Sequence, residues 1–290
     1  MGAVKACGAA VFGALLAART GASEPLPHLE KQGSATRLMV DGEPFLMLAG
    51  ELHNSSSASL DYLAALWPRL RALNLNTVLA PVSWEQLEPE EGHFDFALTD
   101  GLLRQARQQK MRLVILWFGS WRNGVSSYAP EWVKRDLARF PRAQGSSDHN
   151  TKDLLSALSA SNREADARAF AALLRHLREV DGRHHTVIGV QVENEVGIKP
   201  EPRDLSAASE AAFRGAVPAE LTTYLAAHRA ALHPELLKRW EAGGFRASGT
   251  WAEVFGGSPG ADEVFSVWCY ARYIDEVARA YGLDPAKIVK

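Results

Sequence analysis

Four short, largely apolar runs constrain the fold of this 290-residue chain most strongly. Segments of helical periodicity or long loops separate them. The runs are Phe45–Gly50, Asn76–Ala80, Met111–Leu116 and Thr186–Val192. A half-exposed strand would alternate between apolar and polar residues, and these runs do not alternate. Strands of this kind are covered on both faces, as in a parallel sheet with helices packed outside it. The pattern therefore predicts an α/β fold made of strand–helix units.

The ends of the runs favour one architecture within that class. Each run is followed on its C-terminal side by polar or aromatic residues, which is where (β/α)8 barrels carry their sites. No glycine-rich phosphate loop follows any run, which disfavours a doubly wound nucleotide-binding sheet. A barrel needs eight strands. After Gly197 the sequence predicts only a polar loop (199–217) and helical segments (218–232, 234–242 and 261–281). We therefore expect roughly the first half of a TIM barrel, with four strands.

Composition narrows the possible partners. Hydrophobic residues make up 47% of the chain and the formal net charge is −2, as in ordinary soluble globular proteins. No basic block stands out, so nucleic acid is not an expected partner. The chain has no His-Glu-x-x-His, Cys-x-x-Cys or Gly-x-Ser-x-Gly motif, and its histidines are scattered. We expect neither a metal nor a cofactor.

The N-terminus has the layout of a secretory signal peptide. Lys5 is followed by an alanine-rich apolar run and then by small residues near Gly21. We expect a signal peptide over residues 1–22, a linker over 23–36 and a catalytic domain over 37–290. The mature protein would then be periplasmic or secreted, with no membrane association after removal of the signal. A buried or frayed N-terminal helix is the alternative interpretation of the same residues.

The fourth run stops on the triplet Glu193-Asn194-Glu195. Burying a charge costs several kcal/mol unless it is paired or used, so two carboxylates at the end of an apolar strand need an explanation. Strict alternation places Asn194 and Glu195 on opposite faces, and both can reach one site only if the strand ends or bulges there, as Gly197 allows. We expect Glu193 in a buried polar layer below the site. An exposed strand end with solvated glutamates is the simpler alternative.

Several segments of the chain resemble the N-terminal half of bacterial glycoside hydrolase family 35 β-galactosidases, which belong to the same clan as family 42. The similar segments occur in order between about Arg37 and Ala280 and are Ala49–Asn54, Trp67–Thr77, Pro81–Phe96, Trp117–Gly124, Ser127–Arg135 and Val190–Gly197. The resemblance implies retaining hydrolysis of terminal β-D-galactosides in a β-galactoside oligo- or polysaccharide. It also implies that Glu195 is the acid/base and that Asn194 binds the substrate.

Retaining hydrolysis needs a second carboxylate as nucleophile, and the resemblance places it on the seventh barrel strand. Glutamates after Gly197 fall in helical or loop contexts, at Glu241, Glu253, Glu263 and Glu276. We therefore expect the chain to lack its nucleophile and to be a truncated hydrolase. A non-catalytic or vestigial carbohydrate-binding domain is the main alternative. A complete, shorter barrel of another hydrolase family would need four further strands, which the sequence does not show.

Further substrate-binding candidates lie near the ends of the first three runs. Aromatic rings suit stacking on sugar faces, and polar side chains suit the hydroxyl groups. Trp117 is equally compatible with packing at the top of the barrel, and His53 alone is more typical of a structural histidine. The predicted substrate-binding residues besides Asn194 are Glu51, His53, Trp84, Glu85, Trp117, Trp121 and Asn123.

Overall fold

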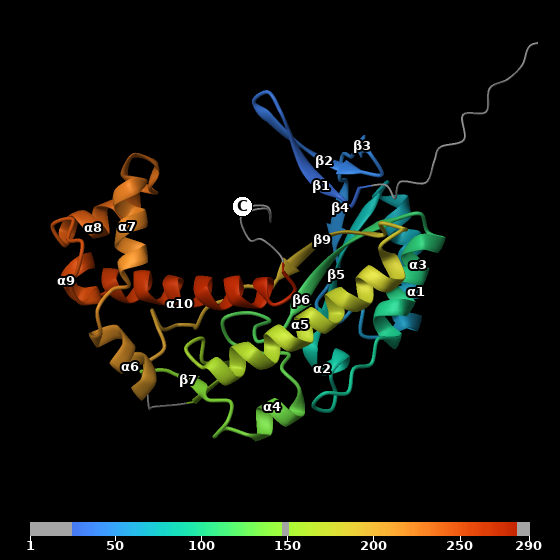
Figure 1. Cartoon of the computed structure of the whole chain (residues 1–290). Helices are drawn as coiled ribbons and strands as arrows, with labels where there is room; N and C mark the ends of the chain where they lie inside the picture. The colour runs from blue at the N-terminus through green and yellow to red at the C-terminus, as the bar shows by residue number, and fades with distance from the viewer. Residues whose placement is uncertain (1–24, 147–150, 283–290) are drawn as a thin grey trace, which may run out of the picture.

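The computed structural model describes residues 25–146 and 151–282. Its central element is a parallel sheet of four strands in the order β4-β5-β6-β9 (Figure 1). The strands are β4 (Ala49–Glu51), β5 (Thr77–Ser83), β6 (Arg112–Phe118) and β9 (Val187–Val192). Spatial order follows chain order without the reversal that defines a doubly wound sheet. The sheet is therefore the first half of a (β/α)8 barrel, as the sequence predicts.

Helices of the predicted type connect these strands. They are α1 (Leu60–Ala72) after β4, α3 (Ala97–Gln108) after β5 and α5 (Ala160–Asp181) before β9. Serines begin two of them, because the Ser59 hydroxyl accepts a hydrogen bond from Tyr62 N and the Ser159 hydroxyl from Asn162 N. The strands and these helices share one hydrophobic core, which includes Val78, Ile115, Leu63, Leu102 and Phe170.

The N-terminal part differs from the predicted linker. Strand β1 (His28–Gln32) lies within residues 23–36 and pairs with β2 (Ala35–Val40), which pairs with β3 (Glu43–Pro44) in a small antiparallel sheet. Asp41 and Gly42 form the expected turn with φ angles of 53° and 78°. The apolar run at 45–50 is a strand only from Ala49, and Leu46 is 76% exposed. The predicted signal peptide lies outside the described residues.

The long loops predicted on either side of β9 contain structure of their own. Before α5 come α4 (Glu131–Arg135) and a hairpin of β7 (Arg142–Gln144) and β8 (Thr151–Leu155), and α2 (Trp84–Leu87) follows β5 directly. The segment 199–217, predicted as polar loop, includes α6 (Ala207–Arg214). The remaining elements are α7 (Ala219–Ala227), η1 (Arg229–Ala231), α8 (Pro234–Ala242), α9 (Trp251–Phe255) and α10 (Gly260–Arg279).

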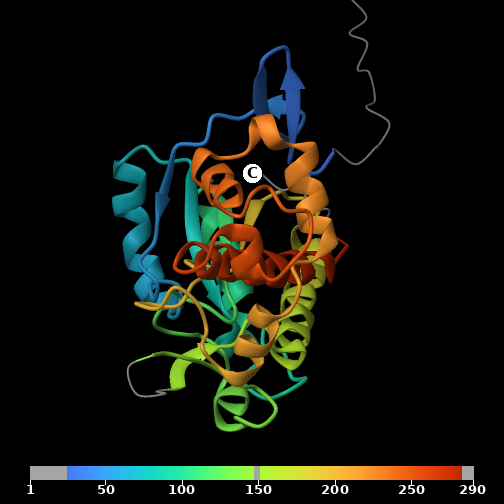
Figure 2. The ribbon, with the colours of Figure 1, turned by 90° about the vertical axis from the view of Figure 1, so that its left-hand side faces the viewer.

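A second hydrophobic cluster lies away from the sheet. Trp240, Trp251, Phe255 and Phe265 pack together there, and α7, α8 and α9 gather at the end of α10 that is remote from the strands (Figures 1 and 2). The other half of α10 packs on α5 and places Tyr270 and Tyr273 in the main core. In the described ranges, no helix combines the length and the apolar character that a membrane span requires.

Candidate active site

The carboxyl ends of the four parallel strands meet at one edge of the sheet, because parallel strands all end on the same side. Glu51 ends β4, Glu85 follows β5 and the segment 119–123 follows β6. The triplet Glu193-Asn194-Glu195 follows β9. The fold therefore brings all the predicted site segments to the same edge.

The backbone after β9 resolves the alternation problem. The strand ends at Val192, and both Glu193 (φ 63°) and Glu195 (φ 42°) take the left-handed conformation. This region is uncommon for residues other than glycine, and the surrounding structure must hold it in place. The turn separates the two glutamates, since Glu193 is 2% exposed whereas Glu195 is exposed. The simple alternative of two solvated glutamates therefore does not hold for Glu193.

Asn194 is fixed by hydrogen bonds at both ends of its amide. Its Nδ2 donates to the carbonyl of Arg122 at 2.7 Å, and its Oδ1 accepts from Gln191 Nε2 at 2.7 Å. With the Asn54 amide oxygen facing Arg122, that oxygen accepts from Nε at 2.7 Å and from Nη2 at 2.6 Å. Arg122 thus ties together the ends of β4, β6 and β9. Sequence reasoning did not select Arg122, although it lies inside the Trp117–Gly124 segment that carried the resemblance.

Glu193 lies in a buried polar layer, as predicted. It accepts hydrogen bonds from the backbone amides of Ser120 at 3.1 Å and Trp121 at 2.9 Å. Asp166, which is 0% exposed, lies beside it and accepts from Trp117 Nε1 at 2.9 Å. Burial first, and then the charge of Asp166, raise the pKa of the Glu193 carboxyl well above its usual range. Asp166 comes from α5, far along the chain, and no local signal marks it.

The three predicted tryptophans occupy the core. Trp84, Trp117 and Trp121 are each 0% exposed. Trp84 Nε1 donates to Glu88 at 2.7 Å, and Trp121 packs edge-on against Tyr270 and Tyr273. Stacking on a sugar would require an open ring face. The structure instead assigns these indoles a packing role, which for Trp117 is the alternative weighed above.

The remaining predicted residues lie at the surface of the site edge. Glu85 is half-buried and forms an ion pair with Lys134 at 3.3 Å, and its backbone N–H donates a hydrogen bond to the Tyr128 carbonyl. Asn123 uses its Oδ1 within a local turn, accepting from Val125 N and from the Ser126 hydroxyl at 3.0 Å each. Glu51 and His53 are exposed. Their substrate-binding role stays a prediction.

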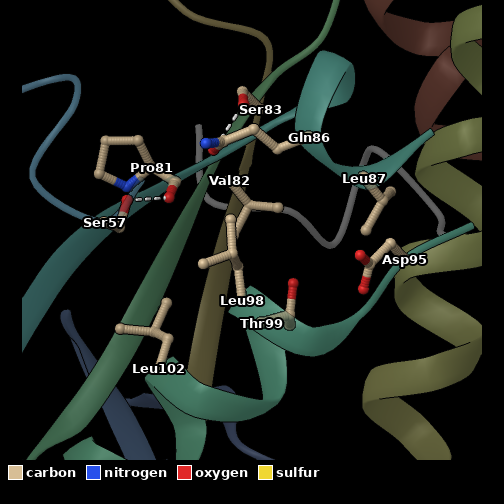
Figure 3. Close-up of a pocket in the computed structure, with 10 residues that line it drawn as sticks. All are labelled: Ser57, Pro81, Val82, Ser83, Gln86, Leu87, Asp95, Leu98, Thr99 and Leu102. Atoms are coloured by element: carbon tan, nitrogen blue, oxygen red, sulfur yellow. Dashed lines mark hydrogen bonds between the residues drawn. The ribbon is translucent and has the colours of Figure 1, made fainter. Parts of the chain in front are cut away.

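Two hollows lie outside the set of predicted site residues. A cavity of about 20 Å³ between β5 and α3 has room for about one water. Figure 3 shows its polar groups turned to one another, with the Ser57 hydroxyl bonded to the Pro81 carbonyl and the Ser83 hydroxyl to Gln86. A wider hollow of about 310 Å³ opens at the opposite ends of the strands and is lined by Arg107, Lys110, Met111, Arg112, His184 and Thr186. Neither hollow includes a predicted site residue.

The two histidines before β9 lie in different surroundings. His184 is exposed, but His185 is 4% exposed and its Nδ1 lies 2.7 Å from Asp41 Oδ1. Among residues 25–146 and 151–282 no group of three His, Cys, Asp or Glu side chains is placed to hold a metal.

Comparisons with known proteins place this arrangement among glycosidases. The profile of glycosyl hydrolase family 42, described as β-galactosidase, matches residues 65–236, more than half of the chain. A curated β-galactosidase from Xanthomonas manihotis is 28% identical over 186 residues, which cover 63% of this chain and 28% of the relative. The chain therefore spans less than a third of that relative's length.

Two solved structures are similar over part of their length. A cold-adapted β-galactosidase from Rahnella sp. R3 matches 81% of this chain and 34% of its own, with 19% identity and a TM-score of 0.49. The exo-β-1,4-mannosidase Op5Man5 from Opitutaceae bacterium strain TAV5 matches 60% of this chain and 28% of its own, with 19% identity and a TM-score of 0.40.

Proposed function

Because the chain belongs to glycosyl hydrolase family 42, the β-galactosidases, we propose that it carries the acid/base half of a retaining β-galactosidase site. The matching profile belongs to family 42, whereas the sequence motifs resemble family 35. Both are families of β-galactosidases, so both findings agree on a β-galactosidase-type glycosidase. Closer kinship with family 35 stays part of the proposal. Export to the periplasm or the medium, expected from residues 1–22, is likewise proposed.

One observation carries the proposal: an exposed Glu195 stands on a strained turn next to an anchored Asn194. In a retaining mechanism the acid/base carboxyl protonates the glycosidic oxygen and later deprotonates the attacking water. Because Glu195 is exposed, its carboxyl can exchange a proton with the glycosidic oxygen and with the attacking water. The Asn194 amide donates one N–H to Arg122 O, and a second N–H remains for a sugar hydroxyl.

The glutamates that follow Gly197 do not offer a second carboxylate in the position a nucleophile would take. In the described part of the chain, the glutamates considered above lie on helices: Glu241 on α8, Glu253 on α9, and Glu263 and Glu276 on α10. None of them stands at the end of a parallel strand. We propose that the nucleophile is not among the described residues, so that the isolated chain has at most a low hydrolytic rate.

That same observation supports a second candidate function, a non-catalytic domain that binds β-galactosides. Such a domain would need the polar strand ends but no nucleophile. Binding without turnover, measured by calorimetry with a non-hydrolysable β-thiogalactoside, would support it.

An external nucleophile separates the two functions. Azide can attack an aryl β-galactoside from the side that the nucleophile carboxylate of a retaining enzyme would occupy, giving the α-galactosyl azide. If Glu195 acts as the acid, the wild-type chain forms this product from a substrate with a poor leaving group, and Glu195→Gln does not. Glu235→Gln, an exposed change on α8, is the matched control and should behave as wild type. Equal, background rates for wild type and Glu195→Gln would refute catalysis by this chain.

A further inference from the structure

Two carboxyl groups below the site are buried together without a cation. Asp166 is 0% exposed and Glu193 is 2% exposed. Both accept the same amide hydrogen, since Ser120 N lies 2.9 Å from Asp166 Oδ2 and 3.1 Å from Glu193 Oε1. Among the ion pairs of the described residues, neither carboxyl has an Arg, Lys or His partner. Two adjacent buried anions without a counter-charge are strongly unfavourable, so the pair must hold a proton.

The hydrogen-bond donors show which carboxyl is ionised. The Asp166 carboxyl accepts three hydrogen bonds, from Trp117 Nε1 at 2.9 Å, from the Ser120 hydroxyl at 2.6 Å and from Ser120 N at 2.9 Å. An acceptor surrounded by donors suits a carboxylate, which has no hydrogen of its own to offer. The Glu193 carboxyl accepts hydrogen bonds from the backbone amides of Ser120 and Trp121, and it also faces the Asp166 carboxyl. The proton therefore belongs on Glu193, which can donate it to Asp166.

We propose that Asp166 and Glu193 share a single proton carried by Glu193, and that this neutral pair positions Asn194 and Glu195. The inference deepens the proposed function and rests on it for its purpose. Its path is short. Glu193 Oε2 holds Trp121 N at 2.9 Å, and the carbonyl of the next residue, Arg122, accepts from Asn194 Nδ2 at 2.7 Å.

Besides Trp117 on β6 and Ser120 just after it, helix α10 also faces this pair. Tyr273 on α10 lies with its hydroxyl 2.7 Å from the Ser120 hydroxyl and 3.3 Å from Asp166 Oδ2. Burial first, then the charges of Asp166 and Glu193, raise the pKa of the Tyr273 phenol well above its usual range. Tyr273 thus stays neutral, and Tyr270 on the same helix packs edge-on against the ring of Trp121. Glu193 is then the group that ionises first as the pH rises.

Ionisation of Glu193 would place two charges around the one Ser120 amide. Their repulsion would displace segment 120–122 and release the Asn194 amide from Arg122 O. Because the folded-state pKa of Glu193 is raised, its contribution to stability is present at low pH and is lost as the pH rises through that value. Positioning of Asn194 should be lost over the same range.

Infrared and NMR spectroscopy of the full 290-residue chain test the proposal. Wild type should show the carbonyl band of a protonated carboxylic acid at neutral pH, and Glu193→Gln should lack it. The Asn194 side-chain amide signals should move with pH in step with that band in wild type and stay constant in Glu193→Gln. This variant mimics the neutral form, since its amide N–H can donate to Asp166 while its oxygen still accepts from Trp121 N.

Asp166→Asn is the contrasting variant. It would turn an amide donor toward the indole and hydroxyl donors that now bond Asp166, so the Asn194 signals should shift or the fold should weaken. Absence of the acid band in wild type at neutral pH would overturn the shared proton. Asn194 signals that ignore the titration would overturn the positioning role. Neither readout needs turnover, so a failed glycosidase assay would be a separate result.

Discussion

The substitution Gly119→Ala is predicted to destabilise the protein by several kcal/mol through the buried carboxyl cluster. A Cβ at Gly119 would lie closer than 3.0 Å to Glu193 Oε1, Trp117 Nε1 and Asp166 Oδ1. These atoms are buried, Trp117 Nε1 donates to Asp166 Oδ1, and Glu193 Oε1 accepts from Ser120 N. None of them can therefore move aside as the end of a flexible side chain could. Overpacking of this kind costs about 1–3 kcal/mol, and a lost hydrogen bond to a charged group costs about 1.5–3 kcal/mol. One lost bond plus the clash gives about 2.5–6 kcal/mol.

Urea unfolding followed by tryptophan fluorescence measures this cost, with the free energy extrapolated linearly to water. Gly189→Ala on β9 is the matched control, since its Cβ would meet only Val114 methyl groups at 3.7 and 3.8 Å, an ordinary van der Waals contact. Its effect should stay within about 1 kcal/mol. Equal midpoints and equal slopes for the two variants would refute the packing of Gly119 against the carboxyl pair.

Three further predictions concern charged groups. Arg122→Met removes both hydrogen bonds to Asn54; it should lower the unfolding free energy by about 1.5–3 kcal/mol and reduce azide-dependent product formation, and an unchanged urea midpoint would contradict the bridge. Glu193→Gln should lose less stability than wild type as the pH rises from the ordinary glutamate range through the raised pKa of Glu193, because wild type loses stability as this carboxyl ionises; parallel melting-temperature profiles would argue against it. The pKa of Asp41 is lowered: burial opposes this, but hydrogen bonds from His185 and Arg112 outweigh it. Its contribution is therefore present above its ordinary pKa and lost on acidification, so the stability difference between wild type and Asp41→Asn should vanish at low pH.

Much of the fold follows from local patterns. Apolar runs and helical periodicity are properties of a few consecutive residues. The runs placed three of the four parallel strands within a few residues, and helical segments were predicted between them, where the structure has α1, α3 and α5. The first run shows the limit of this reasoning. Residues 45–48 are as apolar as a strand, but the regular pairing with β5 starts only where Thr77 lies opposite Ala49. Before that point, the Leu48 carbonyl accepts hydrogen bonds from Asn76 N and Thr77 N, which do not extend the strand. Strand length depends on the neighbouring strand as well as on composition.

Within the candidate site, the sequence by itself determined that Asn194 and Glu195 follow an apolar strand, and that both can reach one site only if the strand ends or bulges there. That information is local, since an apolar run, a polar triplet and a nearby glycine suffice. Only the tertiary structure decided that Trp84, Trp117 and Trp121 belong to the core, and that Asp166 and Arg122 support the triplet. Burial and hydrogen-bond partners are set by which distant segments pack together, and α5 and the end of β6 reach β9 only once the sheet has formed.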